Sequence, residues 1–245
     1  LETRARALEE AGHPVIRIVL DDRLDIAQEF FRWEIAIATA GAILGINPFD
    51  QPNVQESKDN TSRVLNAASE GQPLPETKPA VNADPLAFYI DTSADDAHHA
   101  MEQFFAQAQQ EDYVALMAYV QETDTTQRRL QHLRSLIRDQ TGLATTLGYG
   151  PRFLHSTGQL HKGGPNSGLF IQFTADDAQD AAIPGRDYGF ATLRRAQALG
   201  DLKALRKHGR RVMRIHLGSD VNAGLDVLGE LMEGTLTRAV LPAGA

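Results

Sequence analysis

Hydrophobic and polar positions alternate along the second half of the chain in blocks typical of strands and helices. Short runs rich in β-branched and aromatic residues predict strands, and longer runs with an apolar residue every three or four positions predict helices. The predicted strands cover residues 86–90, 113–120, 143–147, 168–174 and 211–217. The predicted helices cover residues 95–110, 124–140, 189–208 and 220–233. Strands that alternate with helices predict an α/β fold with a mostly parallel sheet. Because glycine weakens helices, Gly200 is expected to break the third helix.

The first part of the chain is predicted to be mainly helical. Helices are expected over residues 2–11, 24–45 and 53–69, and a β-branched run at 15–20 predicts a buried strand. The helix over 24–45 is apolar on nearly every face from Phe30 onward, so we expect other elements to enclose it.

Residues 70–85 hold four prolines among polar residues and show no apolar periodicity, which predicts a linker. The sequence is therefore divided into residues 1–69, this linker, and a C-terminal α/β domain over residues 86–245. The N-terminus starts within a helical pattern at Leu1 and carries no signal-peptide pattern, so we expect a fragment of a longer chain.

Composition excludes several chemistries. The 245-residue chain has 24 basic and 32 acidic residues, a net charge of −8, which argues against binding nucleic acid. It has no cysteine, which excludes disulfides, thiolate metal ligands and cysteine nucleophiles. The longest apolar stretch, residues 35–46, is too short for a membrane crossing of about 20 residues. A cytoplasmic protein without a membrane partner is expected.

The charges are distributed unevenly. Residues 84–112 carry seven acidic residues and no Lys or Arg, whereas residues 186–214 carry nine Lys or Arg and two Asp. The two blocks are interpreted as solvated helix faces or as a contact with each other, and the alternative is an anion-binding or partner surface on the basic block.

The densest group of polar residues lies at 148–165, directly after a predicted strand. In parallel α/β sheets ligands bind at the carboxyl ends of strands, where hydroxyls, turn amides and a lysine can hold a sugar phosphate. The candidate substrate-binding residues of this segment are His155, Ser156, Thr157, Gln159, His161 and Lys162. A dinucleotide site is disfavoured because Phe153 stands where the fingerprint has its third glycine. The alternative for both histidines is a structural, hydrogen-bonded role.

A second polar group surrounds the start of the helix predicted over 53–69. Gln51 lies at the start of this helix and Lys58 lies seven residues further on, close to two turns, so both side chains can face one cleft. A lysine there can bind an anion or donate a proton. The alternative is a solvated surface lysine.

Two segments resemble known enzymes. The first comprises Trp33-Glu34, Ala40-Gly41-Ala42-Ile43-Leu44-Gly45-Ile46-Asn47-Pro48-Phe49-Asp50-Gln51-Pro52-Asn53-Val54 and Lys58. It resembles the C-terminal signature of phosphoglucose isomerases. The second is Gly150-Pro151-Arg152-Phe153-Leu154-His155-Ser156-Thr157-Gly158-Gln159-Leu160-His161-Lys162-Gly163-Gly164-Pro165-Asn166. It resembles the C-terminal portion of bacterial bifunctional transaldolase/phosphoglucose isomerases, in which a transaldolase barrel precedes the isomerase.

The resemblance implies the fold, the reaction and the roles of particular residues. Residues 1–69 would end a sugar-isomerase-type doubly wound domain, followed by the smaller α/β domain. The reaction would convert glucose 6-phosphate to fructose 6-phosphate through a cis-enediol, with no metal or organic cofactor. Lys58 matches a lysine that contacts the ring oxygen and the developing enediolate, and Gln51 matches a glutamine that helps to bind the sugar phosphate. Glu34 matches a helix glutamate with a structural role.

The family's Ser/Thr phosphate loop and glutamate base lie upstream of the signature and have no match here. We therefore expect this chain to form one wall of an active site without the general base. Its expected partners are a sugar phosphate, the upstream isomerase and transaldolase parts of the same polypeptide, and a second copy in a homo-oligomer. The alternative is a non-catalytic role for residues 86–245 in assembly or in positioning the transaldolase.

Overall fold

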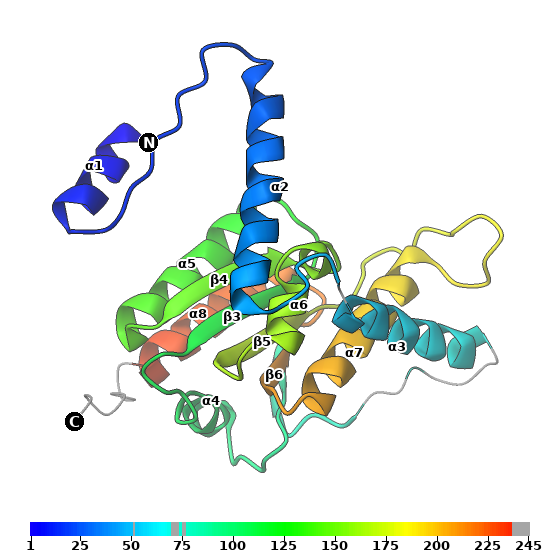
Figure 1. Cartoon of the computed structure of the whole chain (residues 1–245). Coiled ribbons are helices and arrows are strands. Elements are labelled where there is room, and N and C mark those ends of the chain that lie inside the picture. The colour runs from blue at the N-terminus through cyan, green and yellow to red at the C-terminus, as the bar shows by residue number, and fades with distance from the viewer. Residues whose placement is uncertain (51, 70–73, 75–76, 237–245) are drawn as a thin grey trace. The chain divides into compact units, whose positions relative to one another are not determined.

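The computed structural model describes residues 1–50, 52–69, 74 and 77–236 (Figure 1). The chain divides into two compact units, Leu1–Asp50 and Gln51–Ala245. This division differs from the predicted boundary at the 70–85 linker, because the helix that follows residue 51 lies in the second unit. The described part of the chain contains no helix that is long and apolar enough to cross a membrane.

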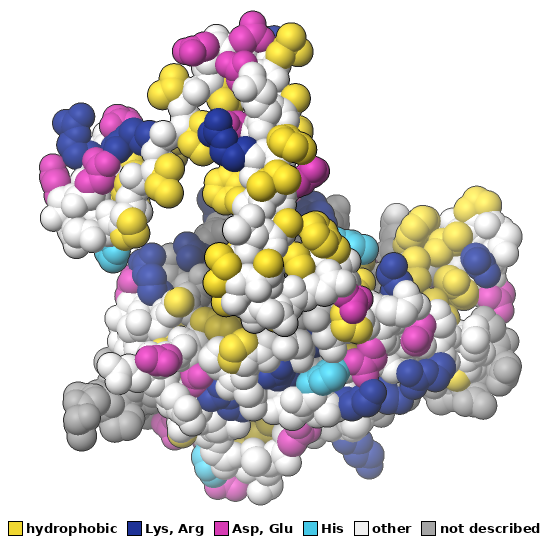
Figure 2. Space-filling view, in the orientation of Figure 1, with side chains coloured by type: hydrophobic (Ala, Val, Ile, Leu, Met, Phe, Trp, Pro, Cys, Tyr) yellow, Lys and Arg dark blue, Asp and Glu magenta, His cyan; other side chains and the backbone are white. Residues whose placement is uncertain are grey.

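The first unit contains two helices, α1 (Glu2–Glu10) and α2 (Asp25–Leu44), as predicted. The strand expected at 15–20 is wrong: these residues form no regular element, because no neighbouring strand pairs with them in this unit. Within this unit, no other element encloses α2 as the sequence predicted. Phe30, Phe31 and Trp33 are each more than half exposed, and Figure 2 shows hydrophobic side chains along α2.

The second unit is built on a six-stranded sheet with the order β1-β2-β6-β5-β3-β4. The strands are β1 (Val81–Ala83), β2 (Leu86–Tyr89), β3 (Tyr113–Tyr119), β4 (Ala144–Tyr149), β5 (Gly168–Thr174) and β6 (Arg211–His216). Strands β3 to β6 are mutually parallel, while β2 runs antiparallel to β6 and β1 antiparallel to β2. The predicted α/β class with a mostly parallel sheet is confirmed. Strand β1 lies inside the segment predicted to be a linker.

Helices cover both faces of this sheet (Figure 1). One face is covered by α4 (Ala97–Phe105), α5 (Asp124–Thr141) and α8 (Val221–Leu236). The other is covered by the 3₁₀-helix η1 (Arg152–His155), α6 (Gly158–Gly163) and α7 (Phe190–Lys207). Helix α3 (Pro52–Ser69) lies alongside α7 and also contacts α6.

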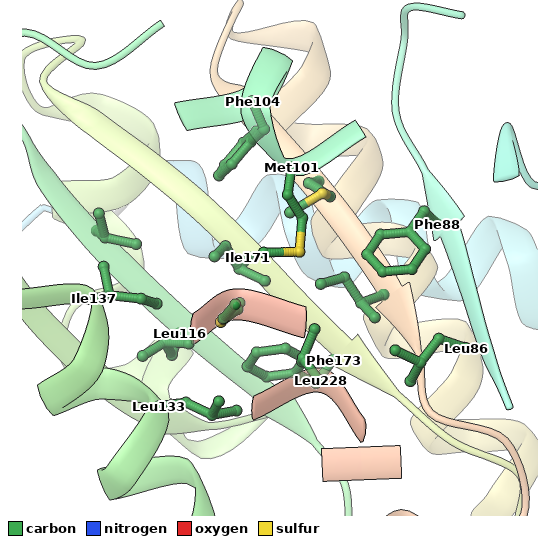
Figure 3. Packing of buried hydrophobic residues seen from close by; sticks show 14 of the residues in the cluster. Leu86, Phe88, Met101, Phe104, Leu116, Leu133, Ile137, Ile171, Phe173 and Leu228 are labelled. Carbon is green, nitrogen blue, oxygen red and sulfur yellow. The ribbon is translucent and has the colours of Figure 1, made fainter. Parts of the chain in front are cut away.

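The strand residues alternate between two apolar clusters because successive side chains point to opposite faces. On β3, Leu116 joins the cluster under α5 and α8, which also contains Ile137 and Leu228 (Figure 3). Its neighbour Met117 joins the cluster under α7. Each large side chain buried in this way contributes about 1.5–3 kcal/mol relative to exposure.

Helix α7 continues through Gly200, so the predicted break is wrong. A Cβ atom at position 200 would lie 2.8 Å from the Thr61 hydroxyl and 2.9 Å from the Thr61 backbone nitrogen. The glycine therefore allows α3 and α7 to approach closely.

The acidic and basic blocks of the sequence contact each other, as one of the two interpretations predicted. Arg206 pairs with Asp91 at 2.9 Å. Arg211 pairs with Asp112 at 2.6 Å, and there both side chains are largely buried.

Candidate functional site

The helix that carries the candidate lysine is held by its buried face. Lys58 is exposed on α3, and among the described residues no ion pair or hydrogen bond is made by its side chain. Its neighbour Ser57 is buried, as is Asn60, whose amide donates to the Gly200 carbonyl oxygen at 3.4 Å. Lys58 is therefore presented to solvent by a helix whose other face is packed. Gln51, the second residue carried over from the isomerase signature, lies outside the described residues.

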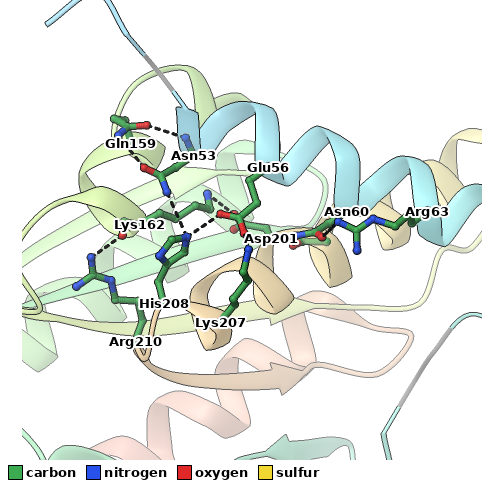
Figure 4. A network of polar contacts seen from close by, with 11 residues as sticks. Asn53, Glu56, Asn60, Arg63, Gln159, Lys162, Asp201, Lys207, His208 and Arg210 are labelled. Atoms are coloured by element: carbon green, nitrogen blue, oxygen red, sulfur yellow. Dashed lines mark hydrogen bonds and ion pairs between the residues drawn. The ribbon is translucent and has the colours of Figure 1, made fainter. Parts of the chain in front are cut away.

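The polar segment 150–166 is partly helical rather than a loop, because it forms η1 and α6. Gln159 of α6 lies beside the first turn of α3. Its side-chain oxygen accepts a hydrogen bond from the Asn53 backbone N–H at 3.3 Å, and its amide donates to the Asn53 side-chain oxygen at 2.8 Å (Figure 4). The unpaired backbone donors at a helix start need such partners. Gln159 thus connects α6 to the start of α3.

A chain of polar contacts continues from Asn53 to the end of α7 (Figure 4). The Asn53 side-chain amide lies 3.2 Å from His208 Nε2. His208 Nε2 also lies 2.6 Å from a Glu56 carboxylate oxygen. The other Glu56 oxygen accepts from Lys207 Nζ at 2.6 Å. These hydrogen bonds from Lys207 and His208 hold the pKa of the Glu56 carboxyl below its ordinary value. They fix the first two turns of α3 against α7.

Lys162 lies inside the protein and faces α7. Its ammonium is 2.5 Å from Asp201 Oδ1, and both side chains are only 1% exposed. Burial raises the pKa of the Asp201 carboxyl, and the Lys162 ammonium opposes that rise. The Tyr119 phenol lies against the same carboxylate, and burial raises its pKa well above the ordinary value. A buried pair of this kind is costly to break because either partner alone is left uncompensated.

His161 is also buried, at 4% exposure, among aromatic rings. Its ring lies 5.1 Å from Phe170 and 6.0 Å from both Tyr113 and Phe153, centroid to centroid. Burial and the neighbouring Lys162 charge lower its pKa to about 4, so the imidazole is neutral at pH 7.

The other three candidates lie nearer to solvent. His155 and Ser156 are exposed and Thr157 is half-buried at the start of α6. The Ser156 hydroxyl donates to the Phe153 carbonyl oxygen at 3.1 Å. The candidate substrate-binding residues thus divide into an exposed group, 155–157, and an inward group formed by Gln159, His161 and Lys162.

Sequence reasoning missed Asn53 and Asp201 as the partners of Gln159 and Lys162. It also missed the contact between Glu56 and His208 that continues this network. One of them had a signal, because Asp201 is an acidic residue among the apolar positions of the helix predicted over 189–208. Within the described ranges, no group of three or more His, Asp or Glu residues is arranged to hold a metal ion.

The fold defines an α/β protein. Helix α3 is packed against α6 and α7 and presents Lys58 to solvent. No family model matches the chain. Over 59 residues the chain is 37% identical to the glucose-6-phosphate isomerase of Lactobacillus helveticus (strain DPC 4571), a match that covers 23% of this chain and 13% of that protein. The chain is thus distantly related to glucose-6-phosphate isomerase and aligns with only a small part of its length.

Among solved structures, the chain is similar to the crystal structure of the hypothetical protein TT0462 from Thermus thermophilus. The TM-score is 0.48 at 20% identity, and the match covers 58% of this chain and 39% of that one.

Proposed function

We propose that this chain is part of a glucose-6-phosphate isomerase and that Lys58 on α3 forms one wall of the active site. The observation that carries the proposal is the 37% identity to a glucose-6-phosphate isomerase over 59 residues. The exposed position of Lys58 supports it, because a lysine that contacts a sugar must be accessible. In this proposal its ammonium contacts the ring oxygen and then the enediolate as negative charge develops there.

The remaining candidates take two different roles in this proposal. Gln51 and the exposed residues His155, Ser156 and Thr157 are candidates for contact with the sugar phosphate. Gln159 and Lys162 are positioning residues, since their side chains contact α3 and α7. His161 supports them from the apolar cluster, where its ring packs against Phe170. A misplacement of about 1 Å can cost two orders of magnitude in rate, so such positioning matters for catalysis.

The general base is proposed to lie in an upstream part of the same polypeptide, together with the Ser/Thr phosphate loop and a fused transaldolase. The exposed apolar side chains of α2 support an upstream partner, because contiguous exposed apolar surface marks an interaction site. We propose that the upstream isomerase part covers α2.

The test is a fructose 6-phosphate isomerisation assay, first on this 245-residue chain and then on a chain extended upstream. In the active form, Lys58→Ala should lower kcat by about 10²-fold or more. The matched control is Lys203→Ala, which removes another exposed helix lysine and should leave kcat unchanged. An unchanged kcat for Lys58→Ala would overturn the assigned role of Lys58.

A second candidate function is assembly of a larger enzyme without direct catalysis. It is favoured by the inward orientation of Gln159 and Lys162, which contact α3 and α7 rather than open solvent. Substitution of the exposed His155 and Ser156 separates the two functions. A loss of kcat with unchanged oligomeric mass supports substrate contact, and a changed oligomeric mass with normal kcat supports assembly.

A further inference from the structure

The face of the sheet under α7 changes from apolar to polar along the strands. On β5, Phe170 belongs to the apolar cluster beneath α7, but the next two residues on that face are Gln172 and Thr174. On the opposite face of the same strand, Ile171 and Phe173 are both apolar. Strands buried between two helix layers are expected to be apolar on both faces. The polar residues of β5 on the α7 side depart from this expectation and indicate a polar environment on that face.

Strand β6 repeats this change beside β5. Val212 lies in the apolar cluster, and Arg214 and His216 follow on the same face. Arg214 is only 3% exposed, and its guanidinium lies 3.7 Å from the ring centroid of Tyr89, its register partner on β2. Burying an arginine at this depth costs more free energy than burying an apolar residue. Such a costly burial is typical of a functional position.

Gln172 donates a hydrogen bond to the Ala198 carbonyl oxygen at 3.0 Å. The other three, Thr174, Arg214 and His216, line a pocket of about 390 Å³ at the carboxyl ends of β3, β5 and β6. Its other wall is the first three turns of α7, where the side chains of Ala191 and Ala198 are small. The sheet order makes this place a switch point, because β4 and β5 lie on opposite sides of β3. Ligands of α/β proteins bind at such points, and the volume lies in the range of small-molecule sites. Lys58 and residues 155–162 do not line this pocket.

The lining offers cations together with hydroxyl-binding groups. The arginines of the lining are Arg194, Arg195 and Arg214. His216 is oriented by Thr174, whose hydroxyl lies 3.1 Å from Nδ1, and by Asp176, whose Oδ1 lies 3.4 Å from Nε2. Guanidinium groups bind phosphate through paired hydrogen bonds, and carboxylates and hydroxyls accept hydrogen bonds from a polyol.

Three carboxylates also line the pocket, and each already has a partner in its wall. Asp176 contacts His216, Asp177 pairs with Arg194, and Asp180 accepts a hydrogen bond from the Ala191 N–H at 2.8 Å. These partners offset the negative charge of the three carboxylates, so the carboxylates repel a bound anion less strongly.

We propose that this pocket binds a small organic phosphate that also carries hydroxyl groups. The phosphate lies against the arginines, and the hydroxyls face Thr174 and Asp176. This site is separate from the helix that carries Lys58, and the inference does not depend on the isomerase proposal.

The test is isothermal titration of the 245-residue chain with fructose 6-phosphate as the probe. Fructose 6-phosphate should bind saturably, inorganic phosphate should bind more weakly, and fructose should not bind. Arg195→Gln removes an exposed charge at the rim, and Ala191→Phe fills the pocket without changing charge. Each should weaken binding at least about tenfold, equivalent to about 1.4 kcal/mol. Arg128→Gln, an exposed arginine on α5 across the sheet, is the matched control and should bind as the unaltered chain does.

The possible outcomes are distinct. Absence of saturable binding to the unaltered, folded chain overturns the inference. Binding that persists in Arg195→Gln and Ala191→Phe but disappears in Lys58→Ala places the sugar phosphate on α3 instead and also overturns it, while the isomerase proposal stands. Equal affinity for inorganic phosphate and fructose 6-phosphate overturns the assignment of the hydroxyl-binding groups. Loss of binding in the two pocket variants alone supports the site, whatever the isomerase assay of Lys58→Ala shows.

Discussion

Gln159 and Asn53, 106 residues apart in the sequence, exchange two hydrogen bonds between α6 and the first turn of α3. One satisfies a backbone donor at the helix start and the other joins the two side-chain amides. The residue pair therefore fixes both the position and the orientation of the helix that carries Lys58.

Replacement of this glutamine is expected to destabilise the protein. Gln159→Ala should lower the free energy of unfolding by about 1–3 kcal/mol, because the partly buried polar groups of Asn53 lose their partner. Denaturant unfolding followed by circular dichroism measures the change. Gln55→Ala is the control, since it removes only an exposed contact with Asp59 on the same helix. Equal losses for the two variants would contradict a special role for Gln159.

The Lys162–Asp201 pair gives a second prediction. Lys162→Met should lower the free energy of unfolding by about 3–5 kcal/mol, because the buried carboxylate is left without its counter-charge. The double variant Lys162→Met/Asp201→Leu should recover much of this loss, as both charges are then absent. Recovery is measured by a double-mutant cycle of denaturant unfolding. Additive losses would show that the two residues act independently.

The protein should lose stability in acid because of His161. Its pKa is about 4 in the folded protein and about 6.5 when unfolded, so the unfolded chain binds the proton more readily. This contribution to stability is fully present above about pH 6.5 and falls as the pH drops toward about 4, by about 3 kcal/mol in total.

The measurement is the free energy of unfolding of the unaltered chain and of His161→Phe between about pH 4 and pH 7. The variant carries no titrating group at this position, so its stability should depend less on pH across this window. Identical pH profiles for the two proteins would remove His161 from this explanation.

Two helical glycines should respond in opposite ways to the same substitution. Gly200→Ala should destabilise by about 1–3 kcal/mol, since the added methyl group would overlap Thr61 of α3. Gly229→Ala on α8 should be neutral or stabilising by up to about 1 kcal/mol, because its methyl group would meet only Leu133, at 3.8 Å. Melting temperatures of the two variants test this pair. A stabilised Gly200→Ala variant would show that the helices can separate at little cost.

Local patterns predicted most of the fold in the second unit. The strand containing Leu116 and Met117 and the helix around Leu133 were predictable because alternation and helical spacing are local properties. The strand expected at 15–20 failed because a β-branched run forms a strand only where another strand pairs with it. The helix break predicted at Gly200 failed for a related reason. Low helix propensity is a local property of glycine, whereas its close neighbour Thr61 belongs to a helix far away in the sequence.

The candidate site was predictable only in part. The sequence singled out Gln159 and Lys162, but it could not distinguish side chains that face a ligand from side chains that face the protein. That distinction depends on Asn53 and Asp201, which approach only in the folded chain. Gln51 stays a prediction, as do the substrate contacts proposed for His155, Ser156 and Thr157.

The long sequence separation between α3 and its partners has a consequence for biosynthesis. Helix α3 is the first helix of its unit to leave the ribosome, yet the residues that hold it belong to α6 and α7. At roughly 5–20 residues per second, α3 must wait on the order of ten seconds for α7 to be made. During that interval Val64 and Leu65, which are buried in the finished protein, have no surface to pack against, so the nascent chain is expected to need chaperone protection at this point. The helix that carries the proposed catalytic lysine is therefore synthesised early but packs against α6 and α7 only after they have been made.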